Sequence, residues 1–415
     1  MPDQNQQGGG SLNLAIGALE KQPTKPDDLA SLVRERYLFS LRSHESYHVE
    51  WRTTLYFFLG YHWVRYADGR FETPSREDIH KLPYVNFILH KARAIVGKET
   101  KNAPTIDIVP ATDQESDRLN ARTVRQVYQY YWDGPLDMPR KVILASLVKN
   151  LFGTVFWKSG WDKTAGAPAI VWTCPLCKGN AADPGECQKC SEKLGQPVSR
   201  ERREIPGGDL RAWVVPPFEG FPAPGALGLM PDDNCPYFTH ATWRPLEWFR
   251  QGFRNGDKVQ PEANVEGFAN QVLGDVRRFG YGSDAMARGG ELSGSTYLEY
   301  YEPPWAMRSE IRAEFPRGRV LKSAGNVLLE DIATGDTQQE GALPDGAYPF
   351  VKVDCVPNPM VGFFGDTPLR QIVALNRKYN RTRVMLERQK NRTLQPNLLL
   401  PKGAGIPKSH FRSGG

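Results

Sequence analysis

The first part of the chain is patterned for helices. Helical spacing of apolar residues runs through 29–66, and it returns in a second segment that would end at Asn102 and Pro104. One face of that second segment collects its apolar residues, which are Val85, Ile88, Leu89, Ala92, Ile95 and Val96. Helical structure is therefore expected on both sides of the intervening turn.

The next stretch combines one short strand with two further helices. Residues 105–110 alternate apolar and polar side chains, as a half-buried strand does. Thr112 and Glu115 stand in the register of a capping box, so a helix is expected to begin there and to end at Gly134. Another helix is expected over 139–152.

The middle of the chain changes to a β pattern. Residues 154–161 and 169–174 are rich in aromatic and β-branched residues, and this pattern resumes at 209–224, beyond four closely spaced cysteines. The cysteine segment is therefore expected to interrupt a hairpin. Further strands are expected in 296–304, in a hairpin over 307–331 and in 348–354.

The last predicted element is a long amphipathic helix. Thr367 and Pro368 suit the N-cap and first position, and no glycine or further proline follows up to Arg392. About 25 residues of helix would span roughly 38 Å. At 100° per residue, one narrow stripe contains Arg370, Arg377, Arg381, Arg388 and Arg392. The opposite side is expected to be the packing face and contains Leu369, Ile372, Leu375, Tyr379 and Leu386.

Composition narrows the class of protein. The chain has 415 residues, 40% of them hydrophobic, and a formal net charge of +6. This length suits two or three domains or one elongated protomer of an assembly, and mild basicity permits contact with polyanions without requiring it. Residues 1–28 have the Gln, Gly, Pro and Asp content of a disordered arm and lack a secretory signal. Without a run of about 18 apolar residues, the protein is expected to be soluble and to make no membrane contact.

Four of the six cysteines form two CxxC pairs, which are Cys174, Cys177, Cys187 and Cys190. Two such pairs can converge on one tetrahedral ion, and thiolate ligands favour zinc. Free thiols, a disulfide and a rubredoxin-like iron site are the alternatives. Four protein ligands would leave no open coordination position, so the ion would hold the loop together without catalysing a reaction. The pattern does not resemble a secreted disulfide framework, so folding in a reducing cytoplasm is expected.

Other chemistry has little support in the sequence. The chain contains no GxxxxGK[ST] phosphate loop, nucleophile elbow, GxGxxG or HExxH motif, so no enzymatic activity is expected. The arginine stripe can face a nucleic acid, where it would supply a salt-dependent attraction that is blind to base sequence. It can equally be a solvated face, or it can pair with acidic residues of a neighbouring chain.

The order of several segments resembles that of the portal proteins of tailed double-stranded DNA bacteriophages, the head-to-tail connectors. In chain order the segments are VNFILHKARAIVGKETKNAPTIDIVP, VYQYYWD, LVKNLFGTVFWKSGWD, VVPPFEGFPAP, THATWRPLEWFR, YLEYYEPP and FGDTPLRQIVALNRKYNRTRVMLERQKNRTLQPNLLLPKGAGI. The resemblance covers nearly all of the chain. It depends on the order of these segments, because no single one is as diagnostic as a catalytic signature.

The resemblance implies an α+β wing domain at 29–364, a stem helix at 365–392 and the beginning of a clip domain at 393–415. The cysteine loop is not a general feature of that family, so it would be a zinc-knuckle insertion at 172–192 in a wing hairpin. Family members continue beyond this region with the rest of the clip, a second stem helix, a tunnel loop and a crown.

In function, the resemblance implies a non-enzymatic, ring-forming component of the unique capsid vertex of the virion, assembled in the host cytoplasm. About twelve copies would surround a channel through which DNA is packaged and later ejected. The implied partners are double-stranded DNA, bound non-specifically, the terminase large subunit, scaffold and capsid proteins, and neck (head-completion) proteins.

Two other interpretations fit the same residues. The chain could be a zinc-ribbon enzyme or factor that binds nucleic acid and whose catalytic part lies outside this chain. It could also be a zinc-stapled scaffold without a role in DNA handling.

Overall fold

The structure, a computed structural model, describes most of the chain between Lys25 and Leu394. The described residues are 25–74, 82–101, 106–162, 165–177, 180–181, 185–194, 196–262, 271–272, 275, 279, 293–307, 309–332, 343, 346–358 and 362–394. The predicted clip segment from 395 onward and the predicted arm up to residue 24 lie outside this description.

The fold is α+β, as predicted. The α-helices are α2 (Pro26–Ser43), α3 (Glu45–Leu59), α5 (Phe87–Thr100), α6 (Glu115–Asp133), α7 (Met138–Phe152), α8 (Gln188–Leu194), α9 (Leu246–Gly252), α12 (Ser309–Glu314) and α13 (Pro368–Leu394). The strands are β1 (Arg65–Ala67), β2 (Arg70–Glu72), β3 (Thr154–Asp162), β4 (Pro168–Thr173), β5 (Asn180–Ala181), β6 (Glu201–Pro206), β7 (Asp209–Val215), β8 (Gly220–Pro222), β9 (Phe238–Pro245), β10 (Gly294–Glu302), β11 (Arg319–Ala324), β12 (Val327–Asp331) and β13 (Phe350–Asp354).

A five-stranded antiparallel sheet in the order β12-β11-β10-β9-β8 forms the centre of the body. Helix α2 covers one face, where Val33 and Tyr37 pack in one buried cluster with Leu298 and Tyr300 of β10. The spacing of four between Val33 and Tyr37 places both on one helical face, and the spacing of two between Leu298 and Tyr300 places both on one sheet face. The apolar side of the helix therefore packs on the apolar side of the sheet.

The opposite face of this sheet meets a second, three-stranded sheet in the order β13-β3-β7. Aromatic rings fill the space between the two sheets: the ring centroid of Phe238 lies 4.8 Å from that of Phe350 and 5.4 Å from that of Phe156. Helices α3 and α7 extend the same core through Trp51, whose indole N–H donates to the carbonyl of Phe152 at 2.9 Å. Burial of these rings stabilises the contact between the two sheets.

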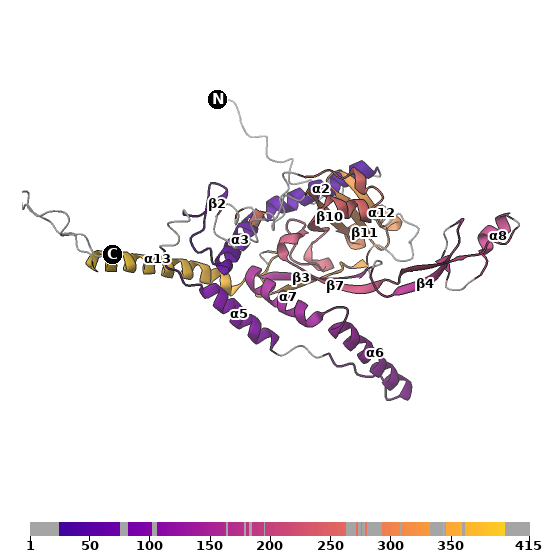
Figure 1. Ribbon diagram of the computed structural model, residues 1–415, viewed down its shortest axis with the longest axis horizontal. Helices are drawn as coiled ribbons and strands as arrows, with labels where there is room; N and C mark the ends of the chain where they lie inside the picture. Colours follow the sequence, from indigo (N-terminus) through magenta and orange to yellow (C-terminus); the bar gives the residue numbers. More distant parts are fainter. Residues whose placement is uncertain are drawn as a thin grey trace, which may run out of the picture.

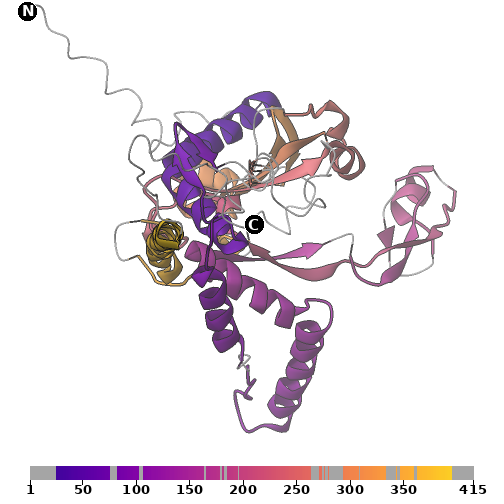
Figure 2. The ribbon, with the colours of Figure 1, turned by 60° about the vertical axis from the view of Figure 1, so that its left-hand side comes forward.

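Three parts extend away from this body (Figure 1). Helix α13 leaves it on one side. A ribbon built from β3 and β7, and further out from β4 and β6, leaves on the opposite side and ends near α8. Helix α6 follows α5 and lies beside α7 at a third corner, as Figure 2 also shows. Along the whole of α6 no side chain is buried.

Several local predictions need correction. Residues 26–28, predicted as the end of the arm, form the first turn of α2, because Pro26 suits that position and Asp27 and Asp28 complement the positive end of the helix dipole. Residues 106–110 form no strand, and α6 is preceded by Gln114 without the predicted capping box. The first half of the predicted hairpin at 307–331 is instead the short helix α12.

No helix in the described part of the chain is both long enough and apolar enough to span a bilayer.

Candidate functional site

The four predicted cysteines come together at the far end of the ribbon. Their sulfur atoms all lie within 4.8 Å of one another, and Cys177 Sγ is 3.6 Å from Cys187 Sγ. Tetrahedral coordination at a metal–sulfur distance of about 2.3 Å places ligand sulfurs roughly 3.8 Å apart. The cluster therefore has the dimensions of a four-thiolate zinc site, and all four ligand positions are supplied by the chain.

Local structure explains this convergence. Strand β4 ends at Thr173, so Cys174 leads directly from the strand into the turn that carries Cys177. Cys187 precedes α8, its N–H donates to the carbonyl of Val198 at 2.9 Å, and its own carbonyl accepts from the Cys190 N–H at 3.1 Å. One knuckle thus follows a strand and the other opens a helix, which is how two CxxC pairs reach one point.

The thiols influence one another's protonation. The backbone N–H of Cys177 points at the sulfur of Cys174 and lowers the pKa of that thiol to about 7. The hydrogen bond from the Cys177 side chain, with burial, raises the pKa of Cys190 to about 12. Four thiols packed together cannot all ionise without a counter-charge, and a bound divalent cation removes this restriction. The donor set therefore fits a metal better than it fits free thiols.

The end of the ribbon, formed by the described residues of 165–206 and here called the cysteine lobe, has almost no apolar core of its own. Its buried cluster consists of Cys174, Cys187 and Cys190, with Val198 packed against it. None of the larger cores contains a described residue between 165 and 206. Residues 201–206 form strand β6, which pairs with β4. The lobe is thus a β ribbon whose tip depends on the cysteine cluster.

The second candidate site is α13, which is one unbroken helix from Pro368 to Leu394. Thr367 caps it as predicted, because its hydroxyl oxygen accepts from the N–H of Leu369 at 3.2 Å. The helix extends two residues beyond Arg392, the predicted end of the stem.

The face of α13 that packs against the body differs from the predicted one. Leu369 is buried and Ile372 contacts the core, but Leu375, Tyr379 and Leu386 are exposed. The buried residues of the helix are Leu369, Val373, Asn376, Asn380 and Val384. Beyond its first turn, the predicted packing face therefore does not pack against the body, and two asparagines occupy the central positions of the face that does.

Asn376 and Asn380 clamp the segment that leads into α5. Their side-chain oxygens accept from the N–H groups of Phe87 and Val85, each at 2.9 Å. Both side-chain amides donate to the carbonyl of Val85, at 2.8 and 3.2 Å. These bonds satisfy the backbone groups of Val85, which precedes α5, and the N–H of Phe87, which as the first residue of α5 has no partner within the helix. Polar residues therefore hold this interface.

Replacing one clamp residue is expected to destabilise the body. Asn376→Ala leaves the N–H of Phe87 without its partner, so we expect the free energy of unfolding to fall by about 1–3 kcal/mol. Asn391→Ala is a matched control, because Asn391 is exposed on the same helix, and its change should stay within about 0.5 kcal/mol. Denaturant titration measures both. Equal effects of the two variants would contradict the clamp.

The five predicted arginines occupy different environments. Arg370 pairs with Glu50 at 2.9 Å and with Asp366 at 3.4 Å. Arg377 is half-buried, with its guanidinium carbon 5.1 Å from the centre of the Phe57 ring. The remaining three, Arg381, Arg388 and Arg392, are exposed. The arginine stripe is thus not uniformly solvated, because Arg370 is neutralised by ion pairs and Arg377 packs against Phe57.

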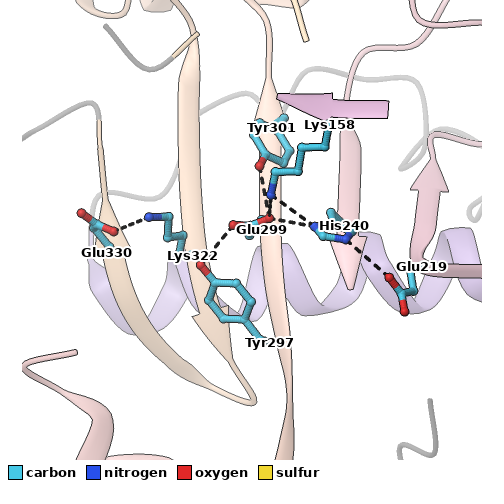
Figure 3. A network of polar contacts seen from close by, with 8 residues as sticks. All are labelled: Lys158, Glu219, His240, Tyr297, Glu299, Tyr301, Lys322 and Glu330. Carbon is cyan, nitrogen blue, oxygen red and sulfur yellow. Dashed lines mark hydrogen bonds and ion pairs between the residues drawn. The ribbon is translucent and has the colours of Figure 1, made fainter. Parts of the chain in front are cut away.

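A network that the sequence did not predict joins the two sheets (Figure 3). The carboxylate of Glu299 forms an ion pair with Lys158 of β3 and lies 2.8 Å from Nδ1 of His240. It also accepts from the hydroxyl groups of Tyr297 at 3.3 Å and Tyr301 at 3.2 Å. Burial alone would raise the pKa of Glu299, but the charge of Lys158 and the hydrogen bond from His240 hold it well below its usual range.

This network is built as a joint between sheets. Several donors converge on one buried carboxylate, which removes its capacity to act as a general base. The signal for it in the sequence is weak but present. Lys158 and Glu299 lie two residues from Phe156 and Tyr301, which are inward-facing, so the period of two places both charges inside.

A comparison with known protein families found no family model that matches the chain, and a comparison with curated proteins found no match either.

Proposed function

We propose that this chain is a portal protein of a tailed double-stranded DNA phage. In this proposal it forms a closed ring at the unique vertex of the capsid, and DNA passes through the ring during packaging and ejection. The ring would also be the docking site for the terminase large subunit, for scaffold and capsid proteins, and later for neck proteins. The proposal assigns no catalysis to the chain; ATP-driven transport belongs to the terminase. The order of segments described above and the geometry of α13 support it.

The observation that carries the proposal is an apolar stripe on α13 that the described part of the chain leaves largely exposed, although the Tyr379 ring also contacts that of Phe87, with 5.0 Å between the ring centroids. Leu375, Tyr379 and Leu386 are 67%, 44% and 60% exposed and lie on one side of the helix. Exposed apolar stripes on soluble proteins mark interaction surfaces. In a ring, the same helix of a neighbouring copy would lie alongside and cover the stripe.

A second exposed apolar surface supports assembly. Helix α6 exposes Leu119, Val124, Val127 and Tyr130 and buries nothing. An amphipathic helix of this length is marginal in isolation, because most helical stability in proteins comes from packing of the apolar face. The helix is accounted for if neighbouring copies pack against it in the ring.

The charges of α13 suit a channel for DNA. Cyclic symmetry would repeat Arg381, Arg388 and Arg392 of each copy as stacked rings of positive charge. Such contacts attract phosphates without reading bases, so they permit sliding. The cysteine lobe and α13 lie at opposite ends of the molecule (Figure 1). In this proposal the lobe is a peripheral zinc-binding insertion in the wing.

Electron microscopy of the full-length gene product tests the proposal. Rings with a central hole, with about twelve copies by the family resemblance, are expected. Monomers with salt-sensitive DNA affinity would instead favour a zinc-containing nucleic-acid-binding factor, and monomers without such affinity would favour a zinc-stapled scaffold. Either of these two results would overturn the proposal.

The apolar stripe makes a specific prediction about assembly. Tyr379→Asp is expected to abolish rings while the monomer stays folded, because the side chain is exposed and a charge in the covered stripe would lack a partner. Arg381→Ala should disturb assembly less. Size-exclusion chromatography with light scattering measures both.

Ala374→Asp is the control for the introduced charge. Ala374 is exposed and lies on a different side of the helix from Tyr379. Equal loss of oligomer in Tyr379→Asp and Ala374→Asp would show that the stripe is not the interface.

A further inference from the structure

A cavity of about 570 Å³ lies between α13 and the segment that connects α3 to β1. Its lining includes His62, Trp63, Arg65, Arg377, Arg381 and Arg388. The volume is typical of small-molecule sites, which usually range from about 300 to 1,000 Å³. Apolar side chains, among them Val64 and Met385, complete much of the lining.

The charge of this cavity is unbalanced. Four guanidinium groups line it, and Glu387 is the one acidic residue among the described lining residues. Within the described part of the chain, none of these four arginines forms an ion pair, in contrast to Arg370 on the same helix. Like charges collected on a concave surface focus a positive potential into it.

Partial burial of the charged Arg377 side chain beside other arginines destabilises the folded protein. It lowers the pKa of Arg377, and the neighbouring charges of Arg381 and Arg65 lower it further. The guanidinium is nevertheless held in place by the Phe57 ring beneath it. A bound anion would offset both the desolvation and the repulsion between the arginines.

Three residues of the lining also contain buried polar atoms without partners in the described structure. Nε of Arg377, Nε1 of Trp63 and both ring nitrogens of His62 are buried without a hydrogen-bond partner in the described structure. His62 is only 1% exposed and is held between the rings of Phe57 and Tyr84, at 5.2 and 4.9 Å. Buried polar groups in native proteins usually have partners, so a cluster of unpaired ones indicates a site for a polar ligand.

We infer that this cavity binds a phosphate group, either of a free mononucleotide or of the DNA backbone. Arginine forks match phosphate oxygens in geometry and charge, and several of them can bind one group from different sides. Trp63 and the apolar wall can accommodate a nucleoside part. A mononucleotide ligand goes beyond the proposed portal function and does not depend on it, because one chain supplies every described residue of the lining. A DNA ligand rests on that proposed function, since Arg381 and Arg388 are also residues of the proposed channel.

Calorimetric titration of the intact chain at low ionic strength tests the inference with three probes: inorganic phosphate, a mononucleotide and a short DNA duplex. Binding of the mononucleotide with competition by inorganic phosphate would identify a free ligand, and binding of the duplex alone would identify the DNA backbone. Absence of binding by all three would overturn the inference. Ring formation is measured separately by microscopy, so failure of this site and failure of the portal proposal give different results.

Variants of α13 decide whether binding is local to the cavity. Arg381→Ala and Arg388→Ala are each expected to weaken binding by about tenfold or more, since each removes a charge-assisted hydrogen bond. Arg392→Ala removes the same charge from the same helix outside the described lining and should change affinity by less than about twofold. Equal weakening by all three variants would indicate diffuse attraction to the helix and would overturn the inference.

Discussion

We expect the cysteine cluster to bind zinc, and we expect removal of that zinc to unfold the end of the ribbon and to leave the body folded. The lobe has only the cysteine cluster and Val198 as its buried centre. Structural zinc in small domains contributes an apparent binding free energy of about 10–16 kcal/mol, which is their folding free energy. Hydrogen exchange should therefore show that chelation removes protection from the amides of β4 and β6, whereas β3 and β10 keep theirs.

Metal content and a cysteine variant make this prediction specific. Protein purified without chelator is expected to contain about one zinc per chain by elemental analysis. Cys174→Ser should lose that zinc, because Cys174 is a buried member of the cluster. Cys355→Ser is the matched control, since Cys355 lies outside the cluster, and it should keep the metal. A zinc content near zero, or loss of protection that spreads into the body, would contradict this account.

The cysteine site could be predicted from the sequence because its signal is local. Cys174, Cys177, Cys187 and Cys190 fall within one short segment, and a tetrahedral ion requires the two pairs to converge. The same holds for α13, whose N-cap and whose lack of internal glycine or proline are visible without tertiary information. Local rules sufficed for both features.

The face of α13 that packs against the body could not be predicted, because it does not follow the apolar periodicity of the helix. Asn376 and Asn380 are fully buried, yet any hydropathy scale assigns them to the solvent side. Their partners, Val85 and Phe87, lie almost three hundred positions away in the sequence. Only the tertiary fold shows that unpaired backbone groups lie opposite these two side chains.

The prediction of a strand at 105–110 was also wrong for a reason that only the tertiary fold shows. Alternation favours a strand only where a neighbouring strand or core covers the apolar side, and Ile106 and Val109 are 52% and 73% exposed. In the described structure these residues connect α5 to α6 without a sheet partner. Alternation alone therefore does not establish a strand.

Loss of the Glu299 charge is expected to destabilise the body strongly. Glu299→Gln leaves the ammonium group of Lys158 buried without its counter-charge, so we expect the free energy of unfolding to fall by about 3–5 kcal/mol. Glu330→Gln is the matched control on the neighbouring strand pair. Its partner Lys322 lies 2.6 Å away, but the Glu330 side chain is 47% exposed, and such pairs contribute less than about 1 kcal/mol. Denaturant titration measures both variants.

The pKa of Glu299 gives the same prediction a pH dependence. The folded protein holds this pKa below the ordinary value of 4.5, so above pH 4.5 the unfolded and folded chains both carry the carboxylate and the full stabilisation is present. As the pH falls below 4.5 toward the folded pKa, the unfolded chain takes up the proton first, and the stabilisation is lost. Wild type and Glu330→Gln should therefore lose stability more steeply on acidification than Glu299→Gln.

A double variant separates charge from packing at this joint. Lys158→Met combined with Glu299→Gln removes both charges and retains similar side-chain volumes, so the uncompensated ammonium group no longer exists. If the cost of Glu299→Gln is electrostatic, the double variant should recover much of the lost stability, and the two substitutions should be strongly non-additive. Additive losses would instead mean that the two sheets are held together at this point by shape alone, with the aromatic contacts of Phe238 and Phe350 supplying the stability of the joint.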